Sequence, residues 1–327
     1  MKVVAIGGGT GLSALLRGLK LHVAGPSNLP QFSPPITRLT AVVTVTDEGG
    51  SSGRLRRDFR MLPPGDIRNC MVALAEDEQL FTQLFNYRFA SGRGLRGHSF
   101  GNLFLTALTH LTRDFAKAVR VSGEVLAIRG EIFPSTLSDV RLKARLRTGR
   151  VVYGESPINK TRVPIQRLYI VPSRCRPLPE TLAAIAEADL ITMGPGSLYT
   201  SLVPNLLVRG IPDEIARSKA LKVYVCNLMT QPGESRGYTA ADHVRALQKH
   251  AGQRVFDHVI LNTRPISSPL RRRYAAERAE PVVNDLEKIR ALGVEPVGVD
   301  LLVEDHFARH DSRRLAQLVL ELAAQPR

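Results

Sequence analysis

Apolar and polar residues alternate along the chain in blocks that predict strands followed by helices. Residues 2–6 form a short apolar run that ends at glycine, which is typical of a buried parallel strand. Residues 12–21 then place leucines with the spacing of one helix face, and a proline-bearing connection over 22–35 leads to a second apolar strand over 39–45. This β-α-β unit predicts a parallel sheet with a right-handed crossover.

The pattern changes in the middle of the chain and resumes over 178–261. Helices are predicted over 71–85 and 103–119. Four segments that follow alternate or are rich in β-formers, namely 127–132, 140–147, 150–153 and 165–171. In the second of these segments apolar residues face one way, and the residues that face the other way are Arg141, Lys143, Arg145 and Arg147. This alternation predicts an antiparallel hairpin with one solvent-exposed, positively charged face.

These elements predict an α/β fold, a doubly wound, mostly parallel Rossmann-like sheet with an antiparallel β insertion at about 125–172. We expect a single domain over 1–327, with a C-terminal amphipathic helix over 312–324 and Ser312 as its N-cap. Ligands in such sheets bind beyond the carboxyl ends of the strands, which directs attention to the loops there.

The composition is that of a globular protein without a membrane segment. Of 327 residues, 43% are hydrophobic and 23% are charged, and the longest apolar runs are far too short to cross a bilayer. The N-terminus has the pattern of a strand rather than of a signal peptide. The three cysteines are widely spaced, so we expect neither a disulfide framework nor a Cys-x-x-Cys metal site. A cytoplasmic location is the expectation.

The charge is less ordinary, because 45 Lys and Arg residues against 30 Asp and Glu residues give a net charge of +15. Such a balance raises the question of nucleic-acid binding. However, the basic residues are scattered, and no aromatic-interleaved basic stretch accompanies the densest run, Arg271-Arg272-Arg273. Anionic small ligands explain the charge about as well, so nucleic acid is not an expected partner.

Five glycine- or hydroxyl-rich segments carry the candidate chemistry, at 7–11, 47–53, 63–69, 97–102 and 194–199. Glycine lets backbone N–H groups point into one concavity, and a helix N-terminus adds partial positive charge. One such loop is a weak signal. Five in one chain predict a phosphate-bearing ligand, a nucleotide or a nucleotide-sugar.

The first two segments are the most informative. The first has Leu12 where a dinucleotide fingerprint needs glycine. We interpret it as a diphosphate cradle, with a plain helix-capping turn as the alternative, and its residues are Gly8, Gly9, Thr10 and Gly11. In the second, Asp47 is placed to hold Mg²⁺ or a ribose hydroxyl. The nest for phosphate oxygens beside it consists of Gly50, Ser51 and Ser52. A solvated loop whose carboxylates pair with its own arginines is the alternative there.

The remaining segments add further candidate contacts. Asp66 is the expected N-cap of a helix that also carries Asn69. His98 and Asn102 lie four residues apart at a helix start and are candidate ligand contacts. A catalytic Ser/His pair is not expected there, because neighbours in sequence rarely point at each other. The phosphate-binding residues expected in the fifth segment are Gly194, Gly196 and Ser197. Near the C-terminus, Tyr274 and Arg309 offer an aromatic platform and a guanidinium to a nucleotide or sugar.

Together these loops resemble the YvcK-type gluconeogenesis factor family, whose relatives are the 2-phospho-L-lactate transferases of coenzyme F420 synthesis. The matching stretches span almost the whole chain: GGGTG at 7–11, TVTDEGGSSGRLR at 44–56, PPGDIRNC at 63–70, GHSFGNL at 97–103, GPGSLYTSLVPNLLV at 194–208 and RHDS at 309–312. The resemblance implies a cytoplasmic bacterial protein that binds a UDP-sugar, UDP-N-acetylglucosamine or UDP-glucose. It also implies a link to gluconeogenic growth and, through cell-wall precursor supply, to cell shape and morphogenesis.

The same resemblance implies roles for individual residues. The nucleotide pocket would be lined by Gly8, Gly9, Thr10, Asp47, Ser51 and Ser197, with Tyr274 and Arg309 on the sugar-diphosphate side. The transferase branch has a more aspartate-rich loop where this chain has DEGGSSG, and Asp47 is the one carboxylate that matches its metal-binding position. No catalytic dyad or cysteine nucleophile is visible. We therefore expect a ligand-binding regulator, as a homodimer, rather than a Mg²⁺-dependent phosphoryl-group transferase.

Overall fold

A parallel sheet forms the centre of the computed structural model, which describes residues 1–24, 34–76 and 78–325. Within these residues the sheet has seven strands, in the order β10-β9-β8-β7-β1-β2-β3, and every neighbouring pair is parallel. The strands are β1 (Lys2–Gly7), β2 (Arg38–Val43), β3 (Glu131–Pro134), β7 (Leu190–Met193), β8 (Leu221–Val225), β9 (His258–Asn262) and β10 (Glu295–Val299). The order runs outward from β1 and β7, which confirms the predicted doubly wound fold.

Helices surround this sheet, and its inner strands are buried on both faces. All of β7 and residues 3–7 of β1 are buried, because side chains alternate between two covered faces. None of the described helices combines the length and apolar character that a bilayer-spanning segment needs. The helices are α1 (Gly9–Leu19), η1 (Lys20–His22), α2 (Gly50–Phe59), α3 (Gly65–Leu74), α4 (Glu78–Asn86), α5 (Phe100–Thr112), α6 (Phe115–Val125), α7 (Glu155–Asn159), α8 (Pro179–Ala186), η2 (Leu198–Leu202), α9 (Val203–Leu207), α10 (Ile211–Arg217), α11 (Ala240–Ala251), α12 (Ser268–Ala276), α13 (Leu286–Arg290) and α14 (Ser312–Ala324).

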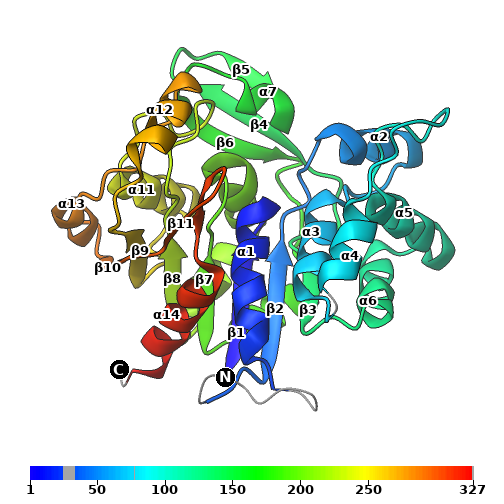
Figure 1. Ribbon diagram of the computed structural model, residues 1–327, viewed down its shortest axis with the longest axis horizontal. Coiled ribbons are helices and arrows are strands. Elements are labelled where there is room, and N and C mark those ends of the chain that lie inside the picture. Colours follow the sequence, from blue (N-terminus) through cyan, green and yellow to red (C-terminus); the bar gives the residue numbers. More distant parts are fainter. Residues whose placement is uncertain (25–33, 77, 326–327) are drawn as a thin grey trace.

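The predicted antiparallel insertion is a small sheet in the order β5-β4-β6, formed by β4 (Arg141–Leu146), β5 (Val151–Tyr153) and β6 (Ile165–Val171). Figure 1 shows it at the end of the central sheet that lies opposite both termini. The apolar side chains of β4 are buried and Arg141 and Arg145 are exposed, as the alternation predicted. The start of the insertion was placed too early. The strand predicted over 127–132 is β3, which pairs parallel with β2 in the central sheet.

Two predicted helices are each divided. The helix predicted over 71–85 is the end of α3 and most of α4, because Ala75 leaves the helix and bridges to Ile128. The helix predicted over 103–119 ends at Thr112. Arg113 takes up left-handed backbone geometry there, and Asp114 caps α6 by accepting the Lys117 N–H at 3.0 Å. Most of the connection predicted over 22–35 lies outside the described residues.

The C-terminal strands and helix close the fold. The strands β11 (Leu302–Glu304) and β12 (Ala308–His310) form an antiparallel pair before α14. α14 packs along α1 (Figure 1), so closely that a Cβ atom at Gly18 would overlap the Ser312 carbonyl oxygen. Ser312 is not the N-cap. That position belongs to Asp311, whose carboxylate accepts the N–H groups of Arg313 and Arg314 at 3.0 and 3.1 Å.

This cap can be tested with a matched pair of neighbouring substitutions. Asp311→Ala removes the side chain that pairs two otherwise unsatisfied N–H groups, so we expect it to lower the free energy of unfolding by about 1 kcal/mol. Ser312→Ala, one residue away on the same helix, should change it by less than about 0.5 kcal/mol. Thermal unfolding of both variants measures the difference, and equal melting temperatures would contradict the assignment.

Candidate functional site

The carboxyl ends of β1, β2 and β7 meet where the strand order reverses, and the loops that leave them form the candidate site. β1 passes through Gly8 into α1, β2 passes through residues 44–49 into α2, and β7 passes through residues 194–197 into η2. Doubly wound folds bind their ligands at this position, where helix N-termini carry partial positive charge.

The first and fifth loops approach backbone to backbone, which only glycine permits. A Cβ atom at Gly11 would overlap the Pro195 carbonyl oxygen, and one at Gly196 would come within 3.1 Å of a Leu202 methyl group. Gly9 has a φ of +64°, a conformation that L side chains rarely adopt. Thr10 lies exposed on the first turn of α1. The structure therefore brings the glycines of both loops together.

Asp66 lies beside these glycines, and it is not the N-cap predicted for it. Pro64 holds the N-cap position of α3, and Asp66 lies in its first turn. A Cβ atom at Gly8 would come within 2.7 Å of the Asp66 carboxylate. Removal from water, followed by the nearby negative charge of Asp47, raises the pKa of Asp66 to about 8, although a hydrogen bond from the Gly9 backbone opposes the shift. Asp66 is therefore mostly protonated at neutral pH.

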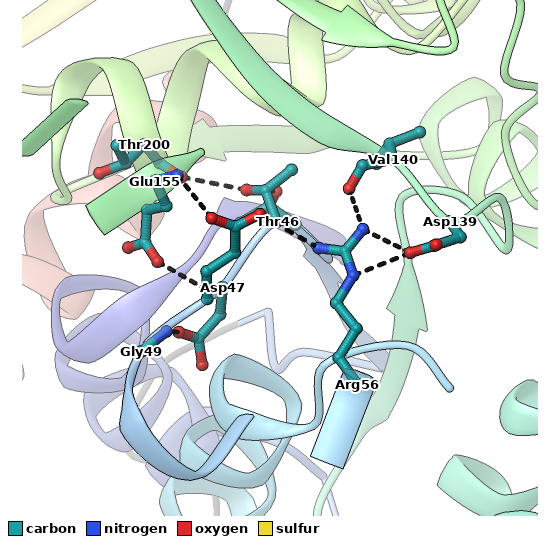
Figure 2. A network of polar contacts seen from close by, with 10 residues as sticks. Thr46, Asp47, Gly49, Arg56, Asp139, Val140, Glu155 and Thr200 are labelled. Carbon is teal, nitrogen blue, oxygen red and sulfur yellow. Dashed lines mark hydrogen bonds and ion pairs between the residues drawn. The ribbon is translucent and has the colours of Figure 1, made fainter. Parts of the chain in front are cut away.

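A reciprocal clamp ties the second loop to the small sheet. The Glu48 N–H donates to Glu155 Oε2 at 2.7 Å, and the Glu155 N–H donates to Glu48 Oε2 at 3.0 Å. Figure 2 shows Glu155 and Asp47 close together in this network. Burial raises the pKa of Glu155 to about 7, and the negative charges of Asp47, Glu234 and Glu48 add to the shift. The clamp thus places a second carboxyl with an elevated pKa beside Asp47.

Arg56 anchors the other side of the same loop. Its side chain is only 4% exposed, and it donates to the Asp139 carboxylate and to the Val140 carbonyl oxygen (Figure 2). Asp139 and Val140 immediately precede β4, so this contact fixes α2 to the base of the small sheet. Arg56 therefore positions the loop of Asp47 rather than facing a ligand itself.

The N-terminal turns of α2, α3 and α5 converge beside Asp47. Ser51 and His98 Nδ1 are 2.9 Å apart, and the Asn102 amide donates to Ser52 Oγ at 3.3 Å. Asn69 joins through Arg68, which donates to the Asn69 side chain and to Ser99 Oγ, each at 2.7 Å.

Burial, followed by the charge of Arg54, lowers the pKa of His98, so its ring is neutral at pH 7. Gly50 is exposed at the start of α2, and a Cβ there would meet nothing within 4 Å.

Residues 227–234 line the other side of the site, and the sequence reasoning missed them. The Asn227 amide bonds both the N–H and the carbonyl of Gly196, at 3.1 and 2.8 Å, and Gln231 donates to Ser197 Oγ at 2.8 Å. Glu234 is buried and accepts the Tyr199 N–H and the Thr200 hydroxyl, each at 2.6 Å. The available signal was the apolar run that became β8, which ends just before Asn227, and the Pro-Gly turn in the loop that follows.

The fifth loop itself turns at Gly194, whose φ is +82°. A Cβ atom there would lie 2.8 Å from the Val225 carbonyl oxygen, so this glycine serves the backbone turn next to β8. Ser197 is held by Gln231 and precedes the π-helical turn η2.

Tyr274 and Arg309 lie in a different group. The Tyr274 hydroxyl accepts the Ala308 N–H at 3.1 Å, and its ring packs on a small apolar cluster with Leu228 and Ile266. The Arg309 side chain is 62% exposed, pairs with Asp305 at 3.2 Å and lies over the Phe307 ring. No contact of the described residues joins either one to Asp47 or to the glycines. Their predicted role on the sugar-diphosphate side stays a prediction.

A pocket of about 180 Å³ lies at the carboxyl ends of β8 and β9. Along the sheet edge it separates the glycine loops around Asp47 from the residues around Tyr274 and Arg309. Its lining includes Asn227 and Leu228, which connect it to the fifth loop and to the Tyr274 cluster respectively. Asn262, Ile266 and Asn284 complete a mixture of amide and apolar groups. Such a lining suits a flat, partly polar ring.

The fit of a metal ion rests on Asp47. Among the described residues, no group of three or more His, Cys, Asp and Glu side chains is arranged to hold a metal ion. The Asp47 carboxylate accepts the Gly49 N–H at 2.7 Å and lies against Gly65, where a Cβ atom would overlap it. Since Mg²⁺ is usually held by one or two carboxylates together with phosphate oxygens and water, a cation here would need the phosphates of the ligand.

Comparison with known proteins shows the family to which the chain belongs. The family described as 2-phospho-L-lactate transferase CofD matches residues 3–302. A putative gluconeogenesis factor from Nostoc sp. is 51% identical over 98% of this chain and 68% of its own length. The gluconeogenesis factor of Bacillus subtilis is 46% identical over 98% of both chains.

The fold comparison agrees with the sequence comparison. A crystal structure of a UPF0052-family protein from Bacillus halodurans is 46% identical to this chain. It covers 97% of this chain and 98% of its own, with a TM-score of 0.90. Because the family match and these relatives extend over nearly the whole chain, the protein belongs to the 2-phospho-L-lactate transferase CofD family and is similar to the proteins named gluconeogenesis factor.

Proposed function

We propose that this protein is a cytoplasmic regulator that binds a UDP-sugar, UDP-N-acetylglucosamine or UDP-glucose, without consuming it. By the resemblance and the names of its relatives, it would act as a gluconeogenesis factor that supports cell-wall supply and normal cell shape during gluconeogenic growth. The observation that carries the proposal is the convergence of the N-termini of α1, α2, α3 and α5 on the glycine loops at the switch point.

The diphosphate would lie over the loops at 7–11 and 47–53. Their glycines let the first turns of α1 and α2 approach a ligand closely, and the helix N-termini favour negative charge. Protonation of Asp66 removes a charge that would otherwise repel the phosphates. The pocket at β8 and β9, lined by Asn227, Asn262 and Asn284, would take the uracil ring.

Binding without turnover is supported by the state of the thiols. Cys70, Cys175 and Cys226 are buried, and burial raises the pKa of each thiol, so none supplies a reactive thiolate at neutral pH. Backbone and hydroxyl groups of the loops would hold the bound diphosphate, and these groups bind it without activating a nucleophile.

Calorimetric titration with UDP-N-acetylglucosamine and UDP-glucose tests this proposal. We expect saturable binding, and phosphorus NMR should show intact ligand after prolonged incubation. Gly9→Ala should weaken binding about tenfold or more, because a side chain at positive φ distorts the cradle. Gly149→Ala, at a β-turn of the small sheet with φ of +84°, is the matched control and should bind like the parent protein. Steady release of UMP or UDP would refute a purely binding role.

The elevated pKa of Asp66 predicts the pH dependence of binding in metal-free buffer. Asp66 is neutral below pH 8 and becomes negatively charged above it, which disfavours an anionic diphosphate. The affinity should therefore fall by about tenfold between pH 7 and pH 9, because the protonated fraction falls by that factor around a pKa of 8. Asp66→Asn should remove the part of this fall that is centred near pH 8 and leave only the contribution of Glu155, whose pKa is about 7. Asp213→Asn, at an exposed residue of α10, should leave the profile unchanged. A profile that is flat in the parent protein would contradict the assignment.

A second candidate function is Mg²⁺-dependent phosphoryl-group transfer. It is favoured by the family description and by the three neighbouring carboxyl side chains of Asp47, Asp66 and Glu155. An acceptor oxygen would attack a phosphorus atom of the nucleotide, and the bond to the leaving phosphate would break with its electron pair. The acceptor proton would pass to a carboxylate. A Mg²⁺ ion held by Asp47 would stabilise the charge on the leaving phosphate.

For this candidate, Asp47→Asn should abolish any Mg²⁺-dependent turnover and leave the melting temperature nearly unchanged, since the substitution preserves shape. Asp213→Asn again serves as the control for loss of one negative charge. The readout is product formation from UDP-sugars and from other nucleotides with and without Mg²⁺. If neither metal omission nor Asp47→Asn changes the fate of the ligand, phosphoryl transfer at this site is excluded.

A further inference from the structure

The exposed face of the small antiparallel sheet gathers aromatic and basic side chains from all three strands. Strand register places them in two rows across the sheet, Tyr169-Lys143-Tyr153 and Arg167-Arg145-Val151, which we call the outer face. The opposite side of β4 carries Leu142, Ala144 and Leu146, all buried in the main core. The outer face therefore points away from the core.

The side chains of the outer face are arranged as a platform. Lys143 Nζ lies 5.7 Å from the centre of the Tyr153 ring and 5.9 Å from that of Tyr169. The Arg167 guanidinium lies 5.9 Å from the Tyr169 ring. Tyr153 is 61% exposed, so its ring remains available to a ligand. Two tyrosines thus flank a lysine, about 10 Å apart because one strand separates theirs.

The charge of this region is concentrated. Residues 141–176 contain ten Lys and Arg residues and one acidic residue, Glu155, which is half-buried and bonded to Glu48. The rest of the chain has 35 basic and 29 acidic residues, which is nearly balanced. A single segment of 36 residues therefore supplies most of the net charge of +15. A surface of this kind favours an extended polyanion over a small neutral partner.

The combination of rings and cations identifies the polyanion. Single-stranded nucleic acids bind to sheet faces on which exposed bases stack on aromatic rings while lysine and arginine neutralise phosphates. A duplex keeps its base faces stacked inside the helix, and an acidic peptide has no bases to stack on the tyrosine rings. A pocket beside the outer face, lined by Lys143, Tyr169, Pro172 and Arg174 among others, continues the same chemistry. Strand pairing gathers basic and aromatic residues that are scattered in the sequence, and against the expectation from the sequence alone we propose that the outer face binds single-stranded nucleic acid.

The test measures fluorescence anisotropy of a labelled 12-nucleotide RNA of mixed sequence with the full chain near physiological ionic strength. The double variant Tyr153→Leu/Tyr169→Leu keeps apolar surface but removes the aromatic rings, and we expect it to weaken binding about tenfold or more. Arg145→Gln/Arg167→Gln should make the slope of log K against log salt concentration shallower, by an amount that corresponds to the loss of about one to two phosphate contacts. The matched charge control is Arg271→Gln/Arg272→Gln on α12, which should have little effect.

The outcomes separate this proposal from its rivals. Loss of binding that is equal in the outer-face and α12 charge variants would overturn it, since net charge alone would then account for the affinity. Tighter binding of duplex RNA, polyglutamate or anionic vesicles, with no effect of the tyrosine substitutions, would also overturn it. All variants should retain the melting temperature and UDP-sugar titration of the parent protein, which separates failure here from failure of the proposed nucleotide site.

Discussion

Backbone contact between loops is the constraint on which the site depends. At Gly8, Gly11 and Gly65 a Cβ atom would overlap or crowd Asp66, Pro195 and Asp47 respectively. Each of these glycines lies at the start of a helix, where N–H groups lack partners inside the helix. The missing side chains therefore do two things at once. They let four loops from distant parts of the chain close on one point, and they bring the N-terminal turns of α1 and α3 to that point.

That closure brings acidic groups together, and the fold manages their repulsion by burial and protonation. Asp47 comes from the second loop, Asp66 from the first turn of α3, and Glu155 from α7, which connects β5 to β6. The pKa of Asp66 and that of Glu155 are both raised. A site with several ionised carboxylates would repel a diphosphate, whereas a protonated carboxyl such as that of Asp66 can donate a hydrogen bond to it. The same groups could hold a cation once phosphate oxygens supply the remaining ligands. Local geometry thus allows both binding and transfer chemistry.

Local sequence signals predicted the secondary-structure elements better than they predicted the tertiary contacts of individual residues. β1 and β2 were predicted because they are short apolar runs, whereas β3 was assigned to the insertion and β10 was not predicted. Asp66 looked like a cap because capping is a local property, while its contact with Gly8 depends on tertiary packing. Glu155 and Glu234 were missed for the same reason. The local sequence around a carboxylate does not indicate which distant residue it will contact in the fold.

The small sheet shows how one insertion can serve two surfaces. On its inner side Glu155 and Arg56 fix it to the loop of Asp47, so it helps to shape the nucleotide site. On its outer side the period of two places every basic side chain of β4 away from the core, and cross-strand pairing adds the tyrosines. Aromatic and basic residues that are scattered along the chain become neighbours only when the strands pair. The inner contacts of the small sheet run through Glu155 and Arg56, and neither residue belongs to the two rows of the outer face.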